Sequence, residues 1–247
     1  MLEIKNMSFS ITTNERNVEI LRNIDLKLLD NRIYAITGPN GGGKSSLAKI
    51  LMGIFQPTFG QIWMDGCDIT PLSITERAHL GIGYAFQQPP RIKGMKIKEL
   101  LELAASENQK NTNTSDLLYD VGLSAGDYLD RNVDSNLSGG EMKRLEIATV
   151  FARNLKVAIF DEPEAGTDLW SLQRLAENFQ NMHARFDTTI VIISHQEKIL
   201  ALADEIILMT DGEIKGVAEK DKILSEILHS DSCLYQTHCG REGWPQC

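Results

Sequence analysis

The chain has 247 residues, of which 42% are hydrophobic, so it is long and apolar enough to bury a core in one large domain or a domain with an inserted lobe. Its net charge of −9 argues against a large sequence-independent surface for nucleic acid, and we expect no nucleic-acid partner. No apolar run approaches the ~18 residues of a membrane span and the amino terminus lacks a secretion signal, so we expect a cytoplasmic chain without direct membrane insertion.

The first thirty residues predict paired strands. Apolar and polar residues alternate from Leu2 to Ile11 and again from Ile20 to Leu28, with an Asn/Glu/Arg turn between the two stretches. This pattern is typical of an antiparallel β region.

The next element is a glycine-rich loop between a predicted strand and a predicted helix. Residues 33–36 are apolar, residues 38–45 read G-P-N-G-G-G-K-S, and residues 47–51 favour helix. The spacing G-x-x-x-x-G-K-S in this context is that of a P-loop, whose backbone N–H groups bind phosphate at a helix N-terminus. We expect Lys44 to reach the β- and γ-phosphates and the Ser45 hydroxyl to bind Mg²⁺. The predicted nucleotide-binding residues of this loop are Gly38, Pro39, Asn40, Gly41, Gly42, Gly43, Lys44, Ser45 and Ser46.

Three short elements and a helical segment follow the P-loop. We expect a helix at 47–53, a hairpin with an Asp-Gly turn at 59–66, and a strand at 82–87. Helical spacing at 96–106 and 115–121, between two strand-rich halves, predicts an inserted helical lobe.

The second half predicts a parallel sheet. After a long helix from 141 to about 153, the unbroken apolar runs at 157–160 and 190–193 are typical of strands covered on both faces. A helix at 169–184 joins them, and a strand at 206–209 completes the sheet.

The predicted fold class is α/β. It is a P-loop NTPase with a mainly parallel sheet core, an N-terminal antiparallel β region and the inserted helical lobe. We place the ATPase domain at 1–230, with its lobe at approximately 88–150 and its last helix near 219–228. A cysteine-bearing tail occupies 231–247.

Two carboxylates follow one of the predicted buried strands. Asp161 and Glu162 come directly after 157–160, and α/β sheets bind ligands at such strand ends. Asp161 is placed to hold the Mg²⁺ bound by Ser45, and Glu162 to orient or deprotonate an attacking water. The alternative is that both residues only cap a helix.

The order of the motifs resembles that of the ATP-binding-cassette ATPases over nearly the whole chain. These motifs are the P-loop, Gln87 after a strand, L-S-G-G-E at 137–141, D-E-P at 161–163, and His195. The resemblance implies Mg²⁺-dependent hydrolysis of ATP to ADP and phosphate, with ATP and Mg²⁺ as cofactors.

The resemblance also implies individual roles. Gln87 would contact Mg²⁺ or the lytic water, and His195 would contact the γ-phosphate, so the expected catalytic residues are Glu162, His195 and Gln87. The expected metal ligands are Ser45, Gln87 and Asp161. Ser138, Gly139 and Gly140 would clamp the γ-phosphate of ATP held by a second subunit, and Asp168 would cross the interface. Many relatives stack adenine on an aromatic residue, but Ile11 stands about where it would lie, and we expect the nearby Phe9 and Phe55 to belong to the core.

Residues beside these motifs resemble one branch of the family. Importers and exporters tend to have T-S-A-L-D after the D-E-P and glutamine after the signature glycines, whereas this chain has E-A-G-T-D at 164–168 and Glu141. These stretches and residues 86–94 are more similar to the ATPase subunit of the Suf iron–sulfur cluster assembly system, SufC. Leu145, Thr167 and the pair after His195 depart from it, so we expect a divergent SufC-like protein.

The implied partners are a soluble scaffold similar to SufB or SufD, docking near the Gln87 loop and the helical lobe, and a second ATPase subunit in an ATP-dependent dimer. The basic residues Arg91, Lys93, Lys96 and Lys98 are either a solvated face or part of that docking surface. The alternative function is the nucleotide-binding subunit of a membrane transporter. A DNA-repair or chromosome-associated ATPase is disfavoured because long coiled-coil or DNA-binding insertions are absent.

The tail contains three cysteines and a histidine: Cys233, Cys239, Cys247 and His238. Their spacings match no standard zinc or ferredoxin pattern. Two interpretations stay open, a flexible tail with ordinary thiols and a transient contact with iron or a cluster.

Overall fold

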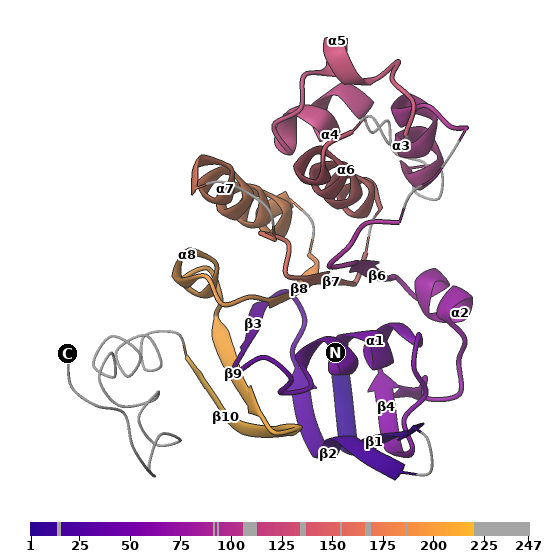
Figure 1. Cartoon of the computed structure of the whole chain (residues 1–247), viewed down its shortest axis with the longest axis vertical. Helices are drawn as coiled ribbons and strands as arrows, with labels where there is room; N and C mark the ends of the chain where they lie inside the picture. Colours follow the sequence, from indigo (N-terminus) through magenta and orange to yellow (C-terminus); the bar gives the residue numbers. More distant parts are fainter. Residues whose placement is uncertain are drawn as a thin grey trace, which may run out of the picture.

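The computed structural model describes residues 1–13, 16–90, 92, 94–105, 113–133, 137–153, 155–165, 169–185 and 187–219. Two β-sheets and their helices form the described part, with one group of helices set apart from the strands (Figure 1). No helix within these ranges is both long and apolar enough to cross a membrane.

The smaller sheet is antiparallel and lies mainly at the start of the chain. Its strand order is β2-β1-β4-β5. Asp65 and Gly66 form the β4–β5 turn with φ of 51° and 80°, so both the expected antiparallel region and its Asp-Gly hairpin are confirmed. The strands are β1 (Leu2–Thr13), β2 (Arg16–Leu28), β4 (Phe59–Met64) and β5 (Cys67–Asp68).

The larger sheet has six strands in the order β10-β9-β3-β8-β7-β6, and all neighbours are parallel except β10, which is antiparallel to β9. Every residue of β3, β7 and β8 is buried, which confirms the expectation from the unbroken apolar runs. The strands are β3 (Ile33–Thr37), β6 (Ile82–Ala85), β7 (Val157–Asp161), β8 (Thr189–Ile193), β9 (Glu205–Thr210) and β10 (Glu213–Glu219).

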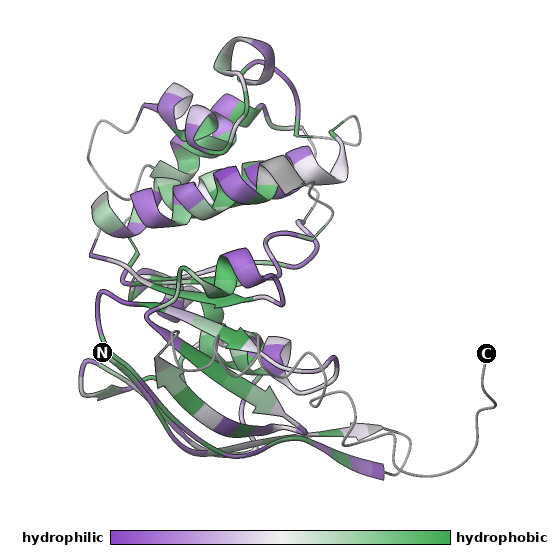
Figure 2. Cartoon of the chain, turned by 90° about the vertical axis from the view of Figure 1, so that its left-hand side faces the viewer, coloured by the Kyte–Doolittle hydropathy of each residue, from purple (hydrophilic) through white to green (hydrophobic). Residues whose placement is uncertain are grey.

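The two faces of this sheet belong to different cores. Because strand side chains alternate, Ala158 and Phe160 of β7 face one core while Val157 and Ile159 face the other. The second core packs helix α1 (Lys44–Met52) between the two sheets. In Figure 2 the central strands are predominantly hydrophobic, whereas the helices carry both kinds of residue.

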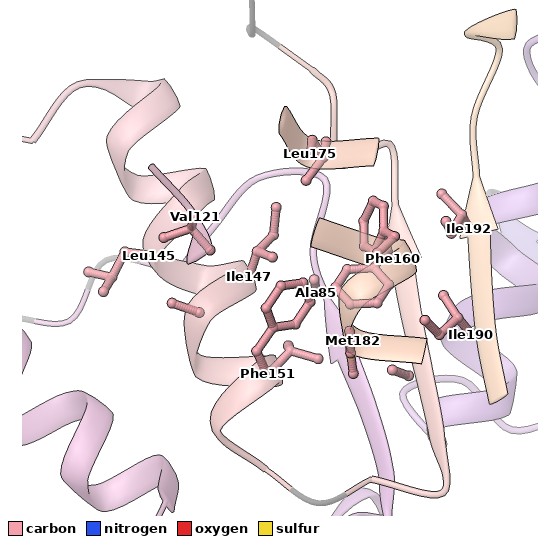
Figure 3. Close-up of a cluster of buried hydrophobic side chains, with 14 of the residues drawn as sticks. Ala85, Val121, Leu145, Ile147, Phe151, Phe160, Leu175, Met182, Ile190 and Ile192 are labelled. Atoms are coloured by element: carbon pink, nitrogen blue, oxygen red, sulfur yellow. The ribbon is translucent and has the colours of Figure 1, made fainter. Parts of the chain in front are cut away.

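The first core joins the sheet to the helices on its other face. Figure 3 shows Phe160 and Ile192 of the sheet facing Phe151 and Met182 of two helices, and the rings of Phe151 and Phe160 meet edge to face at 6.1 Å. The helices after β6 are α3 (Ile97–Ala105), α4 (Thr114–Asp120), α5 (Ala125–Tyr128), α6 (Gly139–Ala152), α7 (Leu169–Arg185) and α8 (Glu197–Leu200). Helices α3 to α6 form the group set apart in Figure 1.

Several elements differ from the sequence expectations. Helix α1 begins at Lys44 rather than residue 47, directly after Gly43, whose φ is 96°. Strand β6 ends at Ala85 rather than 87, because the Phe86 N–H donates to the side chain of Glu146 and not to a neighbouring strand. Of the helix expected near 219–228, Glu219 is the end of β10; the remainder and the tail lie outside the described residues.

Helix α2 (Ile74–His79) was not expected from sequence. Ser73 and Glu76 form a capping box at its start, a pattern that indicates a helix N-terminus. Its Arg77 is 0% exposed and donates hydrogen bonds to four backbone carbonyls. These belong to Ile50 at 2.6 Å and Leu51 at 3.0 Å in α1, and to Thr70 at 2.8 Å and Leu72 at 3.2 Å. Arg77 therefore ties α1 to the segment that follows the small sheet.

Replacing Arg77 by methionine tests this anchor. Arg77→Met removes a donor from four carbonyls, of which those of Ile50 and Leu51 are buried, so we expect the free energy of unfolding to fall by about 3 kcal/mol in urea titrations. The matched control is Arg22→Met, because Arg22 is 49% exposed and pairs with the exposed Glu19 at 3.1 Å. That variant should stay within about 0.5 kcal/mol of the wild type. Equal losses in the two variants would contradict the anchor role.

Candidate functional site

Strand order brings the predicted functional segments to one edge of the large sheet. Strands β3, β8, β7 and β6 are parallel neighbours, so their carboxyl ends lie side by side. The P-loop follows β3, His195 follows β8, Asp161 ends β7, and Gln87 follows β6. This is the edge at which open α/β sheets bind ligands.

The P-loop is pressed against the neighbouring strand β9. Gly38 has φ of 134°, and a Cβ there would lie 1.9 Å from the backbone oxygen of Met209. A Cβ on Gly43, with φ of 96°, would lie 2.6 Å from a side-chain carbon of Leu21. The loop also bonds the turn beyond β9, since the Gly212 N–H donates to the Gly42 carbonyl at 3.2 Å. Only glycine fits this path.

Lys44 is held inside the loop. Its side chain is 5% exposed, and Nζ donates to the carbonyls of Gly38 at 2.7 Å and Pro39 at 2.9 Å. Burial lowers the pKa of the ammonium, while the charges of Glu162 and Asp161 raise it in part. The first turn of α1 therefore presents a desolvated cation and free backbone N–H ends to an incoming phosphate.

Asp161 is oriented by two hydroxyl groups. It is 1% exposed; Oδ1 accepts from Ser45 Oγ at 2.9 Å and Oδ2 from the Tyr84 hydroxyl at 2.7 Å. Burial and the Asp161 carboxylate raise the pKa of Tyr84 well above its ordinary value, so Tyr84 stays a donor. Tyr84 was missed from sequence; a tyrosine in a buried strand, whose hydroxyl needs a partner, is the signal that could have found it.

Oxygen ligands for Mg²⁺ are present at this place. Ser45 and Asp161 are already in contact, and a hard cation favours hydroxyl, carboxylate and amide oxygens together with phosphate and water. In the described part of the chain no group of three or more His, Cys, Asp or Glu side chains is placed to hold a metal by itself. The donor set fits Mg²⁺ that is bound with a nucleotide.

Glu162 turns out of the strand direction and meets Gln87. Its φ is 47°, a strained value for a residue other than glycine, and its N–H donates to the Ile193 carbonyl at 3.0 Å. Its Oε2 accepts from Gln87 Nε2 at 2.6 Å. Gln87 and Glu162 belong to two different motifs of the sequence, and the fold brings their side chains into direct contact.

The charges of Lys44 and Glu162 influence the pKa of His195. Partial desolvation lowers the pKa of its exposed ring, Lys44 lowers it further, and Glu162 raises it. The loop that carries His195 is held by Glu164, whose carboxylate accepts from the Ser194 hydroxyl and from the His195 N–H. Burial raises the pKa of Glu164. The contact of Glu164 with Ser194 and His195 was not expected from sequence.

The signature residues stand at the start of a helix in the group set apart in Figure 1. Ser138 caps α6, whose first residues are Gly139 and Gly140. The Ser138 hydroxyl accepts from the Glu141 N–H at 3.3 Å, and the Glu141 carboxylate accepts from the Ser138 N–H at 2.6 Å and from the Tyr128 hydroxyl. These bonds tie the signature to its own group of helices. Asp168 lies outside the described residues.

Comparisons with known proteins agree with this arrangement. The sequence profile of the family described as ABC transporter matches residues 21–165. The uncharacterized ABC transporter ATP-binding protein MJ0035 of Methanocaldococcus jannaschii is 39% identical over 206 residues, 80% of this chain and 82% of that protein. The probable ATP-dependent transporter ycf16 of Cyanophora paradoxa is 33% identical over 241 residues, 91% of each chain.

Solved structures share the fold. The dimeric post-hydrolysis state of the ATP-binding cassette MJ0796, bound to ADP and Pi, superposes with a TM-score of 0.80 at 23% identity, covering 89% of this chain and 99% of that one. A bacterial Atm1-family ABC exporter with ATP bound gives a TM-score of 0.79 at 21% identity, covering 98% of this chain and 42% of that one.

The capping box of α6 should titrate at low pH. Hydrogen bonds from Tyr128 and then from Ser138 lower the pKa of Glu141 from 4.5 to about 2. Since the folded-state pKa is the lower one, the stabilisation is complete above about pH 4.5 and is lost as the pH falls towards 2. We expect Glu141→Ala to cost about 1 kcal/mol at pH 6 in urea unfolding, and the difference from wild type to shrink at pH 3.

Tyr128→Phe is the matched control, because it should raise the pKa of Glu141, followed by carboxyl NMR, towards its ordinary value. A difference between wild type and Glu141→Ala that stays constant from pH 6 to 3 would contradict this account.

Proposed function

This chain belongs to the ABC transporter family of ATP-binding proteins, and we propose that it is the ATP-hydrolysing subunit of an iron–sulfur cluster assembly complex. As a member of this family it binds ATP with Mg²⁺ and hydrolyses ATP. Members of the family dimerise when they bind ATP.

The observation that carries the finer proposal is the pair of acidic residues Glu141 and Glu164, at the places where importers and exporters tend to have glutamine and threonine. Both have defined contacts, Glu141 with Ser138 and Tyr128, and Glu164 with Ser194. They lie in the two stretches, 137–144 and 161–168, that resemble the Suf ATPase subunit. In this proposal a soluble scaffold similar to SufB or SufD docks beside Gln87 and helices α3 to α6.

The second candidate is the nucleotide-binding subunit of a membrane ABC transporter. The description of MJ0035 as an ABC transporter ATP-binding protein and of ycf16 as a probable ATP-dependent transporter favours it. The two candidates share one hydrolytic site and differ in the partner.

In the proposed mechanism the chain's own residues position ATP and activate water. Mg²⁺, held by Ser45, Asp161 and Gln87, would neutralise charge on the β- and γ-phosphates. Lys44 binds the same phosphates from inside the loop. Glu162 accepts a proton from the attacking water as the water oxygen bonds to the γ-phosphorus and the bond to the bridging oxygen of ADP breaks.

Two further groups complete the site. His195 can donate a ring N–H to the γ-phosphate, and its lowered pKa favours the neutral form of the ring. Ser138, Gly139 and Gly140 are bonded within their own helical group. In the proposal these three residues act on the ATP held by a second chain, so that each dimer contains two composite sites.

Substitutions at Glu162 and Lys44 test the mechanism. We expect Glu162→Gln to bind ATP with wild-type affinity, to lower kcat by about 10²-fold or more, and to accumulate closed dimers, because only the proton acceptor is lost. Lys44→Ala should weaken ATP binding by about tenfold or more. Phosphate release, fluorescent-nucleotide titration and light scattering measure these effects. Glu177→Gln, an exposed carboxylate on α7, is the control. Wild-type kcat in Glu162→Gln would refute the assignment of the base.

Identification of the partner separates the two candidates. We expect affinity capture with the full-length Glu162→Gln chain, under anaerobic conditions, to recover a strand-rich protein without apolar spans. Charge reversal at Arg91 and Lys93 should reduce the recovery, because the proposed docking surface is basic. Recovery of a polytopic membrane protein by the same chain, with the same charge dependence, would instead establish the transporter.

A further inference from the structure

The main chain of Phe86 is held by two side chains of the signature helix. Its N–H donates to Glu146 Oε1 at 2.7 Å, and its carbonyl accepts from Lys143 Nζ. Phe86 follows the last residue of β6 and directly precedes Gln87. Helix α6 therefore supplies the hydrogen-bond partners that β6 loses where it leaves the sheet.

The two side chains form a buried ion pair. Lys143 and Glu146 stand one turn apart on α6, with Nζ and Oε2 separated by 3.5 Å and side chains only 2% and 9% exposed. Lys143 Nζ also lies 3.4 Å from the backbone oxygen of Asp161. The Lys143 ammonium thus contacts the backbone of Phe86, before Gln87, and that of Asp161, at the end of β7.

A buried pair of this kind is not explained by stability. Desolvating two charges commonly cancels their attraction, and apolar residues of similar volume often serve equally well in a core. Lys143 and Glu146 lie on a helix whose neighbouring residues, Leu145, Ile147 and Ala148, are buried and apolar. Unlike these neighbours, Lys143 and Glu146 hydrogen-bond the backbone of Phe86, between the sheet and Gln87.

We propose that Lys143 and Glu146 are positioning residues for hydrolysis, acting through Gln87. By fixing both polar groups of Phe86 they set where the Gln87 amide stands against Glu162, which it contacts at 2.6 Å. Ser138 caps the same helix, so the signature and the carboxylate of Glu162 are linked through one helix, one ion pair and the main chain of Phe86 and Gln87. The inference rests on the roles proposed above for Gln87 and Glu162.

An apolar pair tests the inference without leaving a lone buried charge. Lys143→Met/Glu146→Leu removes both bonds to Phe86 while keeping the side-chain volume. We expect a thermal midpoint within a few degrees of wild type, ATP affinity within about threefold, and kcat about tenfold lower. A structural role alone would lower the midpoint and the affinity together with kcat.

The decisive measurement is a cycle with Gln87→Ala. Groups that act through one residue lose their effect once that residue is removed. We expect Gln87→Ala to lower kcat about tenfold, and the apolar pair to lower it by less than about twofold more in that background. Losses that multiply to about 100-fold would overturn the inference and leave the role of Gln87 intact. A wild-type kcat in Gln87→Ala would overturn both.

Two further variants complete the design. Lys5→Met/Glu3→Leu changes an ion pair on strand β1, whose side chains are 50% and 31% exposed, and should leave kcat unchanged. If the apolar pair does not fold, the cycle is measured with Lys143→Gln/Glu146→Gln, which can keep hydrogen bonds to Phe86. A smaller loss that again disappears in Gln87→Ala supports the inference, and a loss of equal size in both backgrounds overturns it.

Discussion

The burial of the large sheet on both faces is the constraint from which the rest of the site follows. Strands β3, β7 and β8 have no exposed residue, so nearly all their positions must be apolar and polar chemistry is confined to their ends. Because these strands and β6 are parallel neighbours, four predicted functional segments meet at one edge. The geometry of the proposed catalytic site is a consequence of sheet topology before any single side chain is considered.

Within that edge, each charged group is held by a partner from another strand or loop. Ser45 and Tyr84 orient Asp161, Gln87 contacts Glu162, and the P-loop carbonyls hold Lys44. Such contacts keep the groups in place before a nucleotide arrives, so little reorganisation is needed during reaction. Ser138 is instead hydrogen-bonded within the N-terminal cap of its own helix, α6.

The parts of the fold that could be predicted from sequence are those with a local pattern. Strand periodicity, the glycine spacing and the polar residues after apolar runs predicted both sheets and the cluster around Lys44 and Asp161. The parts that escaped prediction depend on contacts between distant segments. Lys143 is 57 residues from its partner Phe86, and Arg77 binds carbonyls up to 27 residues away; a lysine or arginine in a helix gives no sign of such partners. The same distance effect explains why β6 ends two residues earlier than expected.

The position of the P-loop between the two sheets has a thermodynamic consequence. The loop touches β9 through Gly38 and bonds the Gly212 turn, and Gly212 in turn accepts the N–H of Arg22 in the small sheet at 2.8 Å. If the loop binds phosphate as we propose, phosphate binding and the docking of the sheets share the same few atoms. By linkage, a nucleotide that binds only the docked form adds its binding free energy to the cohesion of the whole domain, growing with the logarithm of its concentration. The cellular level of nucleotide would then also set the free energy of unfolding of the chain.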